Sequence, residues 1–536
     1  MRDFDGLIDD FMAEWFEEHP AAATFLGVEG YDDRLGEFSA DAFGRRERQA
    51  AAWIERLDGF SGELSVDQEI DRDLVVSILR GNLIVSDWQV WRRNPDAYLG
   101  PCLNGVFGLF LHRLYPEAEL ARLAAARLRQ VDSVLAAGRA NLAAELAAPV
   151  FVQRAIGQCR AGIAYARDMV PAEISDPSAR ADLAEAGAGA AAAFESFLSF
   201  LEDLESSAGG EYALGEERYS RLLEEKEQLG YGVFELRKRG QAAYDDLDAE
   251  MRALAKAVGG RDDWRSVVEE MNQDHPSSPE EMRLEYEEWT ARARAFLAAH
   301  DLVTFPEGER CEVVPSPPFQ RPVLAVASYF RPPAFRPSLT GRFNVPFPPE
   351  GVSEEEIQKR LQTNSRSSIP TIAVHEAYPG HHWHLTMSQA NPRPVRKVLS
   401  SAYFAEGWGL YSERMMREEG FFADPRHELG HLDARIFRAA RIVVDTSLHV
   451  GDMSFEEAVT FMTTKAGLSE PTARAEVGRY CTWPTQASSY LTGSLEIERM
   501  RSAWLDGGGS LKAFHDKIAG TGVLPIALAE RALFAS

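Results

Sequence analysis

The stretch LARLAAARLRQVDSVLAAGRANLAAELA, from Leu120 to Ala147, is typical of the first two hundred residues and indicates their fold. Ala, Leu and Arg are strong helix formers, and the apolar residues recur at three and four positions, as on one face of an α-helix. An Ala-rich stretch from Ala179 to Leu204 continues this pattern and predicts a packed helix with a face of small residues. Further helices are predicted over residues 219–229, 234–258 and 279–300.

The pattern changes between Leu302 and Pro349, where proline becomes dense and the helical periodicity ends. Short β-branched or aromatic runs appear there, at Val323–Tyr329 and Phe343–Val345. Proline at the borders of such runs is typical of the edges of a small sheet. We therefore predict a mainly α-helical fold with a small sheet near residues 310–350.

A pair of glycines, Gly209–Gly210, follows two serines and marks a plausible boundary in the chain. We expect an N-terminal helical region over 1–210 and a catalytic helical region, with the small sheet, over 211–536. Helices resume at Ser353 and continue almost to the end. The two regions could also pack as one continuous fold, with a cleft between helical lobes.

The composition limits the classes of function. The 536 residues include 83 Asp or Glu and 57 Lys or Arg, for a formal net charge of −26. This acidic surplus argues against nucleic acid or an anionic membrane as the main partner. The first sixteen residues carry five carboxylates and no apolar core of a signal peptide, and no run approaches the roughly 18 apolar residues of a membrane span. The four cysteines lie far apart, which fits reduced thiols, so we expect a soluble, cytoplasmic protein. The sequence does not indicate its oligomeric state.

The segment with the most chemical information is IPTIAVHEAYPGHHWH, residues 369–384. A His-Glu pair followed by another His is similar to the zinc motif HExxH, in which two histidines one helical turn apart bind the metal and the Glu acts as base. The strict motif fails here because Pro379 stands four residues after His375. The next histidines are His381 and His382. The alternative is that all of these are surface residues near a helix end.

A regular helix would not bring these histidines together. Six residues rotate by about 600°, which leaves His381 roughly 120° away from the face of His375 and about 9 Å further along. His382 would share that face but lie about 10.5 Å away, too far for one ion with bonds near 2.0–2.1 Å. Pro379 cannot donate a helical hydrogen bond, and Gly380 permits unusual conformations. We therefore predict a bulge at residues 378–380 that returns His381 to the side of His375, with His382 as the reserve ligand.

A catalytic zinc needs a third protein ligand and an open position for water. The segment YFAEGWGLYSE, residues 403–413, lies in a second predicted helix and offers Glu406 and Glu413 on one face. We choose Glu406 as the third ligand; the alternative is that both are solvated surface glutamates. Gly407 and Gly409 each cost about 1 kcal/mol inside a helix, which indicates that something approaches this backbone closely.

Four segments, HEAYPGHH, EGWGLYSE, RAARIVVDTSLH and PTQASSYLTG, together resemble a bacterial family designated domain of unknown function 885. The similarity covers nearly the whole chain, and that family in turn resembles the gluzincin metallopeptidases, which include thimet oligopeptidase and Taq-type carboxypeptidase. The resemblance implies His375, His381 and Glu406 as ligands of one Zn²⁺ and Glu376 as general base. The chain departs from the gluzincin motif by two extra residues between Glu376 and Gly380.

The same resemblance implies that a tyrosine from a late helix stabilises the oxyanion, and the matching position is Tyr490. Tyr480 is the weaker candidate, and the alternative for both is ordinary packing. The region 329–344 is predicted to form an edge strand that could pair with an extended peptide.

A predicted helix over residues 430–450 carries a polar stripe. The stripe consists of Arg435, Arg438, Asp445 and His449, and Arg441 could pair with Asp445 four residues later. One interpretation is a solvated face. The other is that Arg438 or Arg441 enters the cleft and binds a substrate carboxylate, or orients a ligand through Asp445.

We therefore predict a metal-dependent hydrolase, in first place a zinc metallopeptidase that acts on peptides. Mn²⁺ and Co²⁺ remain alternatives to zinc, because their ligand types overlap. A second hypothesis is a zinc amidohydrolase that acts on a small N-acyl or C–N metabolite. A third is a noncatalytic helical binding protein on the same scaffold. A nuclease is disfavoured by the charge balance.

Overall fold

The computed structural model describes residues 3–318, 320–321, 326–349 and 351–535. The chain divides into two compact units. One comprises Met1–Tyr212 with Pro333–Ser338, and the other comprises Ala213–Pro332 with Leu339–Ser536. The first break lies two residues after the predicted boundary at residue 210. The short return of the chain to the first unit was not predicted.

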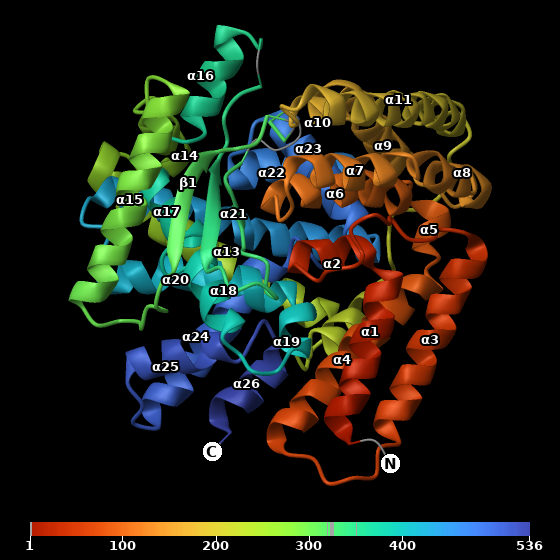
Figure 1. Ribbon diagram of the computed structural model, residues 1–536. Helices are drawn as coiled ribbons and strands as arrows, with labels where there is room; N and C mark the ends of the chain where they lie inside the picture. Colours follow the sequence, from red (N-terminus) through yellow and green to blue (C-terminus); the bar gives the residue numbers. More distant parts are fainter. Residues whose placement is uncertain (1–2, 319, 322–325, 350, 536) are drawn as a thin grey trace. The chain divides into compact units, whose positions relative to one another are not determined.

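The first unit is built from helices, which Figure 1 colours from red to yellow. They are α1 (Phe4–Glu18), α2 (Pro20–Leu26), α3 (Ala40–Asp58), α4 (Val66–Asp87), α5 (Val90–Arg93), α6 (Asp96–His112), α7 (Glu117–Leu128), α8 (Val131–Asn141), α9 (Pro149–Ala164), the π-helical turn η1 (Tyr165–Met169), α10 (Val170–Ala172) and α11 (Pro177–Glu205). The Ala-rich stretch forms α11, as predicted.

The stretch 120–147 forms most of α7 and all of α8, with a break between them. At the end of α7 the fully buried Arg127 donates to the backbone carbonyl of Tyr31 at 3.1 Å. In the break, the side chain of Gln130 accepts from the backbone N–H of Leu35 at 3.0 Å. These bonds to residues about one hundred positions earlier hold the break in place. The local pattern of helix formers gives no sign of them, so it does not predict the break.

The second unit contains the remaining elements. They are α12 (Glu216–Arg221), the π-helical turn η2 (Leu222–Lys226), α13 (Val233–Gly259), α14 (Trp264–Met271), α15 (Pro279–Ala299), β1 (Arg310–Pro315), β2 (Ser328–Phe330), β3 (Thr340–Val345), α16 (Glu354–Gln362), α17 (Ile369–Glu376), α18 (His381–Gln389), α19 (Val395–Val398), α20 (Ala402–Glu418), α21 (Pro425–Val450), α22 (Phe455–Ala466), α23 (Glu470–Thr482), α24 (Ser489–Asp506), α25 (Leu511–Gly520) and α26 (Ile526–Phe534). Helices resume after the N-cap Ser353, as predicted. The fold is mainly α with one small sheet.

The small sheet has the strand order β1-β3-β2. β1 and β3 are parallel, with Arg310 opposite Thr340, and β2 runs antiparallel to β3. Helix α15 packs against the sheet, since the ring of its Tyr286 lies edge-on to Phe343 of β3 at 5.2 Å between centroids.

The predicted edge strand over 329–344 was wrong as a single element. It begins in β2, which is an edge strand, passes through the segment that belongs to the first unit, and ends in β3, which is central. β3 is central because β1, a strand that the predicted runs did not include, pairs on its other side. Residues 323–325 of the run 323–329 lie outside the described residues.

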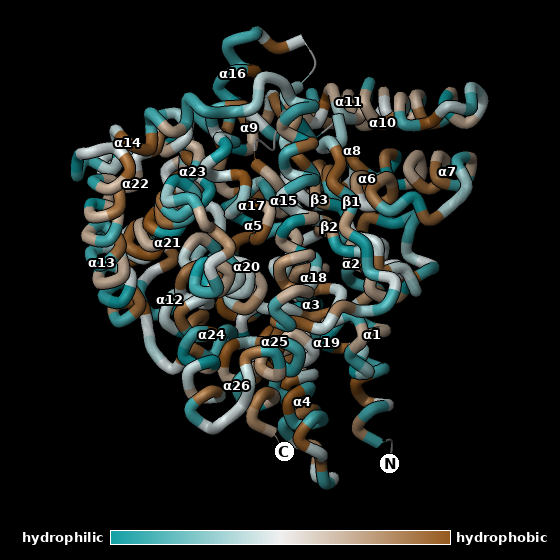
Figure 2. Tube along the Cα trace, turned by 90° about the vertical axis from the view of Figure 1, so that its left-hand side faces the viewer, coloured by the Kyte–Doolittle hydropathy of each residue, from teal (hydrophilic) through white to brown (hydrophobic). Residues whose placement is uncertain are grey.

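Helices α17, α18, α20, α21 and α24 form the part of the second unit that positions the site. α20 and α24 cross at two glycines: a Cβ added to Gly407 would lie 2.5 Å from the backbone of Gly493. Helix α13 packs along α21 (Figure 1), and hydrophilic and hydrophobic residues alternate along α13 in Figure 2. Such alternation is typical of a helix with one face on the core and one in water.

Candidate metal centre

The histidine motif spans two helices. α17 ends at Glu376, the chain turns through residues 377–380, in which the Tyr378–Pro379 bond is cis, and α18 begins at His381. Gly380 lies tightly against the end of α17. Its N–H donates to the carbonyl of Val374 at 3.0 Å, and a Cβ would lie 1.9 Å from the carbonyl oxygen of His375. In place of the predicted bulge, the structure has a complete helix break at these residues.

The break brings the two imidazoles together, with ring centroids 4.7 Å apart. Glu406 of α20 meets both: its Oε2 lies 3.6 Å from Nε2 of His375 and 3.5 Å from Nε2 of His381. One ligand atom from each of the three residues lies within 4.8 Å of the other two. These three side chains are the ones that the sequence proposed as ligands.

Glu413, the alternative to Glu406, lies behind His375. Its Oε1 contacts Nδ1 of His375 at 2.7 Å, and its Oε2 lies 3.4 Å from Nδ1 of His431 on α21. Glu413 and His431 are almost completely buried. A carboxylate in this position fixes the tautomer of the histidine and leaves Nε2 free to bind a cation.

The charges of the cluster favour a cation at its centre. Burial alone would lower the pKa of His375, but its contacts with Glu406 and Glu413 raise this pKa to about 10. Burial would raise the pKa of Glu406, but His375 and His381 hold it well below its usual range. The cluster therefore needs positive charge, which either protons or a metal ion can supply.

The second glycine of α20, Gly409, lies directly against the ring of His375. A Cβ at this position would lie 2.5 Å from Cε1 of His375 and 2.8 Å from both ring nitrogens. The close approach predicted at Gly407 and Gly409 thus has two sources: the backbone of α24 at the first and the imidazole of His375 at the second.

The other two histidines of the motif point elsewhere. His382 is fully buried, and its Nε2 contacts Glu309 at 2.8 Å while its Nδ1 accepts from the hydroxyl of Tyr329 at 2.9 Å. Both nitrogens of the reserve ligand are therefore engaged. His384 packs against the ring of Trp408, and burial lowers its pKa to about 3. Glu309 was not a predicted site residue, because it precedes the motif by about seventy positions and carries no local signal.

Glu376, the predicted base, is the last residue of α17 and is only 9% exposed. Burial raises the pKa of its carboxyl, while the charges of His375 and His381 act in the opposite direction. Arg438 of α21 also lowers this pKa, so its guanidinium lies close enough to influence the site. Its Nη1 donates to the carbonyl of Ala434 at 2.9 Å.

Tyr490 lies in the first turn of α24. Burial, and then the charge of Glu406, raise the pKa of its phenol, so the hydroxyl keeps its proton at neutral pH. That hydroxyl accepts from the Gln486 amide at 3.3 Å. Tyr480 is fully buried and its hydroxyl donates to Glu476 at 2.8 Å, so it has less freedom to act as a donor.

The pairing of Arg441 with Asp445 was wrong. Arg441 donates to Glu476 at 2.9 Å and to the hydroxyl of Tyr480, and its guanidinium lies over the ring of Tyr490. Asp445 instead accepts from the hydroxyl of Tyr219 at 2.6 Å. Spacing on one helix indicates which side chains are neighbours, but partners from other helices compete for them.

The remaining members of the polar stripe are also structural rather than solvated. Arg435 is buried and donates to Glu498 on α24 at 2.6 Å. His449 is fully buried, with its Nε2 2.9 Å from the carbonyl oxygen of Tyr480.

Two solved structures share this fold. One is described as "a putative lipoprotein of unknown function" from Shewanella oneidensis, with a TM-score of 0.82, 20% sequence identity and 100% of both chains covered. The other is described as "the putative lipoprotein" from Colwellia psychrerythraea, with a TM-score of 0.83, 19% identity, and 99% of this chain and 98% of that one covered. A search of curated proteins finds no match.

These descriptions contradict the cytoplasmic location expected from the sequence. That expectation rested on the lack of a signal-peptide pattern and of a long apolar run, and on four scattered cysteines. Scattered cysteines are compatible with a reducing compartment but do not require one. Within the described residues, no helix has both the length and the hydrophobicity needed to span a membrane.

A family model described as bacterial protein of unknown function (DUF885) matches residues 20–533. This match covers nearly the whole chain, including both units and every residue of the cluster. The chain therefore belongs to the DUF885 family of bacterial proteins.

Proposed function

We propose that this protein is a zinc-dependent hydrolase that cleaves peptide bonds, with His375, His381 and Glu406 as the metal ligands. The observation that carries the proposal is the convergence of these donors beside a buried carboxylate. In a tetrahedral site with bonds near 2.0–2.1 Å, ligand atoms lie about 3.3 Å apart. The distances of 3.5 and 3.6 Å from Glu406 to the two imidazoles are close to that value. Mn²⁺ and Co²⁺ accept the same donors.

Two imidazole nitrogens and one carboxylate would hold the ion, and three protein ligands are the number typical of catalytic zinc sites. When bound, zinc lowers the pKa of a water ligand to about 7 and polarises a carbonyl oxygen. Glu376 would accept a proton from the attacking water at its carboxylate and return it to the leaving amine nitrogen. The raised pKa of Glu376 suits this role, because a general base is most efficient when its pKa approaches the working pH.

Tyr490 supplies the second donor for the oxyanion that forms on the attacked carbonyl. Its hydroxyl is protonated, and the charge of Glu406 contributes to its raised pKa, which supports a position near the cluster. A preorganised donor of this kind contributes about 3–4 kcal/mol to catalysis. Arg438, whose charge acts on Glu376, is the candidate to receive a substrate carboxylate by its planar fork.

The choice of peptides as substrates rests on the sheet. β2 is an edge strand, and its Tyr329 contacts His382, the residue next to the ligand His381. An extended peptide paired with β2 would thus lie beside α18. Pairing with an exposed strand is a general way to hold a peptide backbone.

The proposal is tested by metal analysis and one conservative variant. Purified protein should contain one divalent ion per chain, and Glu376→Gln should keep that ion while losing at least about 100-fold in hydrolysis rate, the typical contribution of a general base. Glu419→Gln is the matched control, since Glu419 is exposed on the turn after α20 and should leave both quantities unchanged. A metal-free protein, or an unchanged rate for Glu376→Gln, would refute the proposal.

The substrate class needs its own experiment. A peptide library and a set of small N-acyl amino acids should be compared under the same conditions. A peptidase should show preferences at several residues around the cleaved bond. Cleavage of the small amides alone, without any peptide, would replace the peptidase by the amidohydrolase alternative.

A further inference from the structure

A cavity of about 650 Å³ lies wholly within the first unit, among α1, α3, α4, α6 and the short helices α2 and α5. Its aromatic lining consists of Phe11, Trp15, Phe38, Phe43, Trp53 and Trp91. Cavities of roughly 300–1,000 Å³ with apolar, aromatic walls and a few polar groups are typical binding sites for small molecules. None of the residues of the candidate metal centre lines this cavity.

The aromatic rings form flat surfaces. Phe43 and Trp91 stack with centroids 5.1 Å apart and an angle of 9° between their planes. Trp15 stacks on His19 at 4.6 Å. Burial lowers the pKa of His19, and its Nδ1 contacts the carbonyl oxygen of Trp15 at 2.8 Å, so this imidazole is neutral at pH 7. The faces of such rings carry partial negative charge and attract cations. Arg46 already lies over the rings of Phe38 and Phe43, and Arg56 lies over the ring of Trp53.

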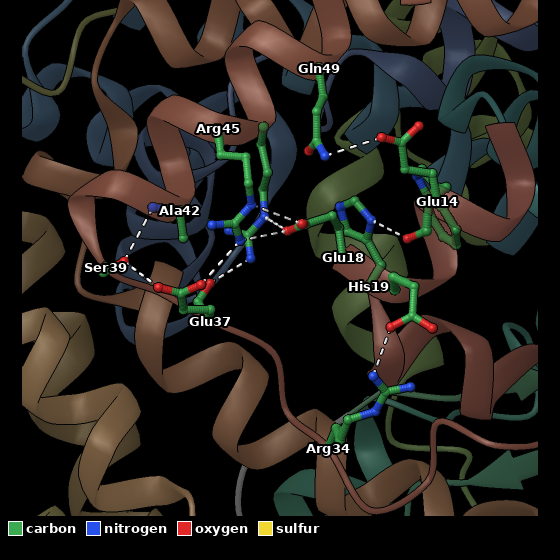
Figure 3. A network of polar contacts seen from close by, with 12 residues as sticks. Glu14, Glu18, His19, Arg34, Glu37, Ser39, Ala42, Arg45 and Gln49 are labelled. Atoms are coloured by element: carbon green, nitrogen blue, oxygen red, sulfur yellow. Dashed lines mark hydrogen bonds and ion pairs between the residues drawn. The ribbon is translucent and has the colours of Figure 1, made fainter.

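The charged residues of the lining are three carboxylates, Glu14, Glu18 and Glu47, and one guanidinium, that of Arg46. Figure 3 shows part of this network, with Glu14 and Glu18 of α1, Arg45 of α3, and Glu37, which precedes α3. Glu18 receives Arg46 at 2.9 Å, and the neighbouring Arg45 lies 3.2 Å from the same carboxylate. Arg45 also contacts Glu37 at 3.1 Å. The two guanidinium groups of this network are therefore paired with the carboxylates of Glu18 and Glu37.

Glu14 and Glu47 have a different environment. Glu14 accepts from the indole N–H of Trp53 at 2.6 Å and from the amide of Gln49 at 3.2 Å, and both donors are neutral. Glu47 accepts from the hydroxyl of Ser86, which is also neutral. These bonds orient the two carboxylates but leave their charges in an aromatic cavity. A ligand with positive charge would complement these two half-buried carboxylates.

We propose that this cavity binds a small organic cation with an apolar body, held by the carboxylates of Glu14 and Glu47 and by the faces of the surrounding rings. Carboxylate and aromatic faces together are the usual means of recognising ammonium groups. A small anion would meet three carboxylates against one arginine that Glu18 already neutralises. A neutral apolar ligand would leave the two carboxylates with neutral hydrogen-bond partners alone and add no charge complementary to theirs.

The test uses the full chain and isothermal titration calorimetry. The probes are benzyltrimethylammonium, its neutral isostere neopentylbenzene, and the anion 3-phenylpropionate. The cation should bind at least about tenfold more tightly than the other two, the difference expected from a favourable cation–π and carboxylate contact. Equal binding of the neutral isostere, tighter binding of the anion, or no binding of any probe would overturn the proposal.

Variants locate the binding. Glu14→Gln and Glu47→Gln keep the shape of the side chain and should each weaken the cation about tenfold, while leaving neopentylbenzene unaffected. Glu55→Gln is the control, because Glu55 is exposed on α3 outside the lining and carries the same charge. Ala22→Phe, which adds a ring at a lining position, should weaken the cation and the neutral probe alike.

The cavity proposal is independent of the hydrolase proposal. Binding of the cation should be unchanged after chelation of metal and in Glu376→Gln. If either treatment abolished it, the probe would be bound at the metal centre, and the assignment to the cavity would be wrong.

Discussion

Gly409→Ala offers a sharp test of the geometry around His375. In the interior of a helix this substitution normally stabilises by about 1 kcal/mol. Here the new Cβ would lie 2.5 Å from Cε1 of His375 and 2.8 Å from both of its ring nitrogens. Ordinary contact between carbon atoms begins near 3.5 Å, so the ring must retreat by about 1 Å.

A displacement of that size is large for a metal ligand, since bond lengths in metal sites vary by only about 0.2 Å. It would also pull the imidazole from Glu413, which holds its Nδ1 at 2.7 Å. Changes to groups that merely orient a ligand cost about 10–100-fold in metal affinity. We therefore expect Gly409→Ala to bind zinc at least about 100-fold more weakly and to lose hydrolysis in proportion.

The assay is competition for zinc with a chromophoric chelator, with circular dichroism to show that the fold is intact. Gly157→Ala is the matched control, because Gly157 lies in the helix α9 and a Cβ there would meet no atom within 4 Å. It should stabilise by about 0.5–1 kcal/mol and leave zinc affinity unchanged. A folded Gly409→Ala protein with wild-type zinc affinity would refute the placement of His375 against α20.

Three further predictions concern the surroundings of the site. Glu413→Gln should lower zinc affinity about 10–100-fold, measured by the same competition, because His375 loses the charge that orients it; an unchanged affinity would contradict this role. Trp408→Phe removes the 2.7 Å bond to the carbonyl of Pro379 and should cost about 1–3 kcal/mol in urea unfolding, whereas a neutral effect would show that the turn is held by other contacts. Burial lowers the pKa of His515 to about 4, whereas an unfolded histidine has a pKa of about 6.5, so unfolding takes up a proton between these two pH values. The free energy of unfolding should therefore fall by up to about 3 kcal/mol when the pH is lowered from 6.5 to 4. His515→Asn should reduce this pH dependence. An identical slope for that variant would place the pH dependence in other groups.

The helical fold could be predicted because its signal is local. Periodicity and helix formers show directly in stretches such as 179–204, which forms α11, and 279–300, which forms α15. The sheet was harder, since the position of a strand depends on partners elsewhere. Phe343–Val345 was recognised as a strand, but its central position follows from β1, thirty residues earlier.

In the candidate site, too, the residues with a local sequence signal were predicted and those that depend on distant partners were not. The motif places His375 and His381 in one segment, and the failure of its spacing indicated that the helix must be interrupted. The residues behind the ligands were missed because they come from distant elements: His431 reaches Glu413 from α21, and Glu309 reaches His382 from the loop before β1. A buried polar residue has no local signature until its neighbours are known.

The connection between β2 and β3 belongs to the first unit over residues 333–338, although both strands lie in the second. The polypeptide therefore passes from one unit to the other at three places, after residues 212, 332 and 338. Cutting the gene at residue 212 would not yield two self-sufficient fragments. The C-terminal fragment would keep a hexapeptide whose native neighbours had been deleted, inserted between the two strands next to the histidine motif. Recombination that exchanged one of these halves would therefore destabilise the small sheet. We expect the two units to be inherited together.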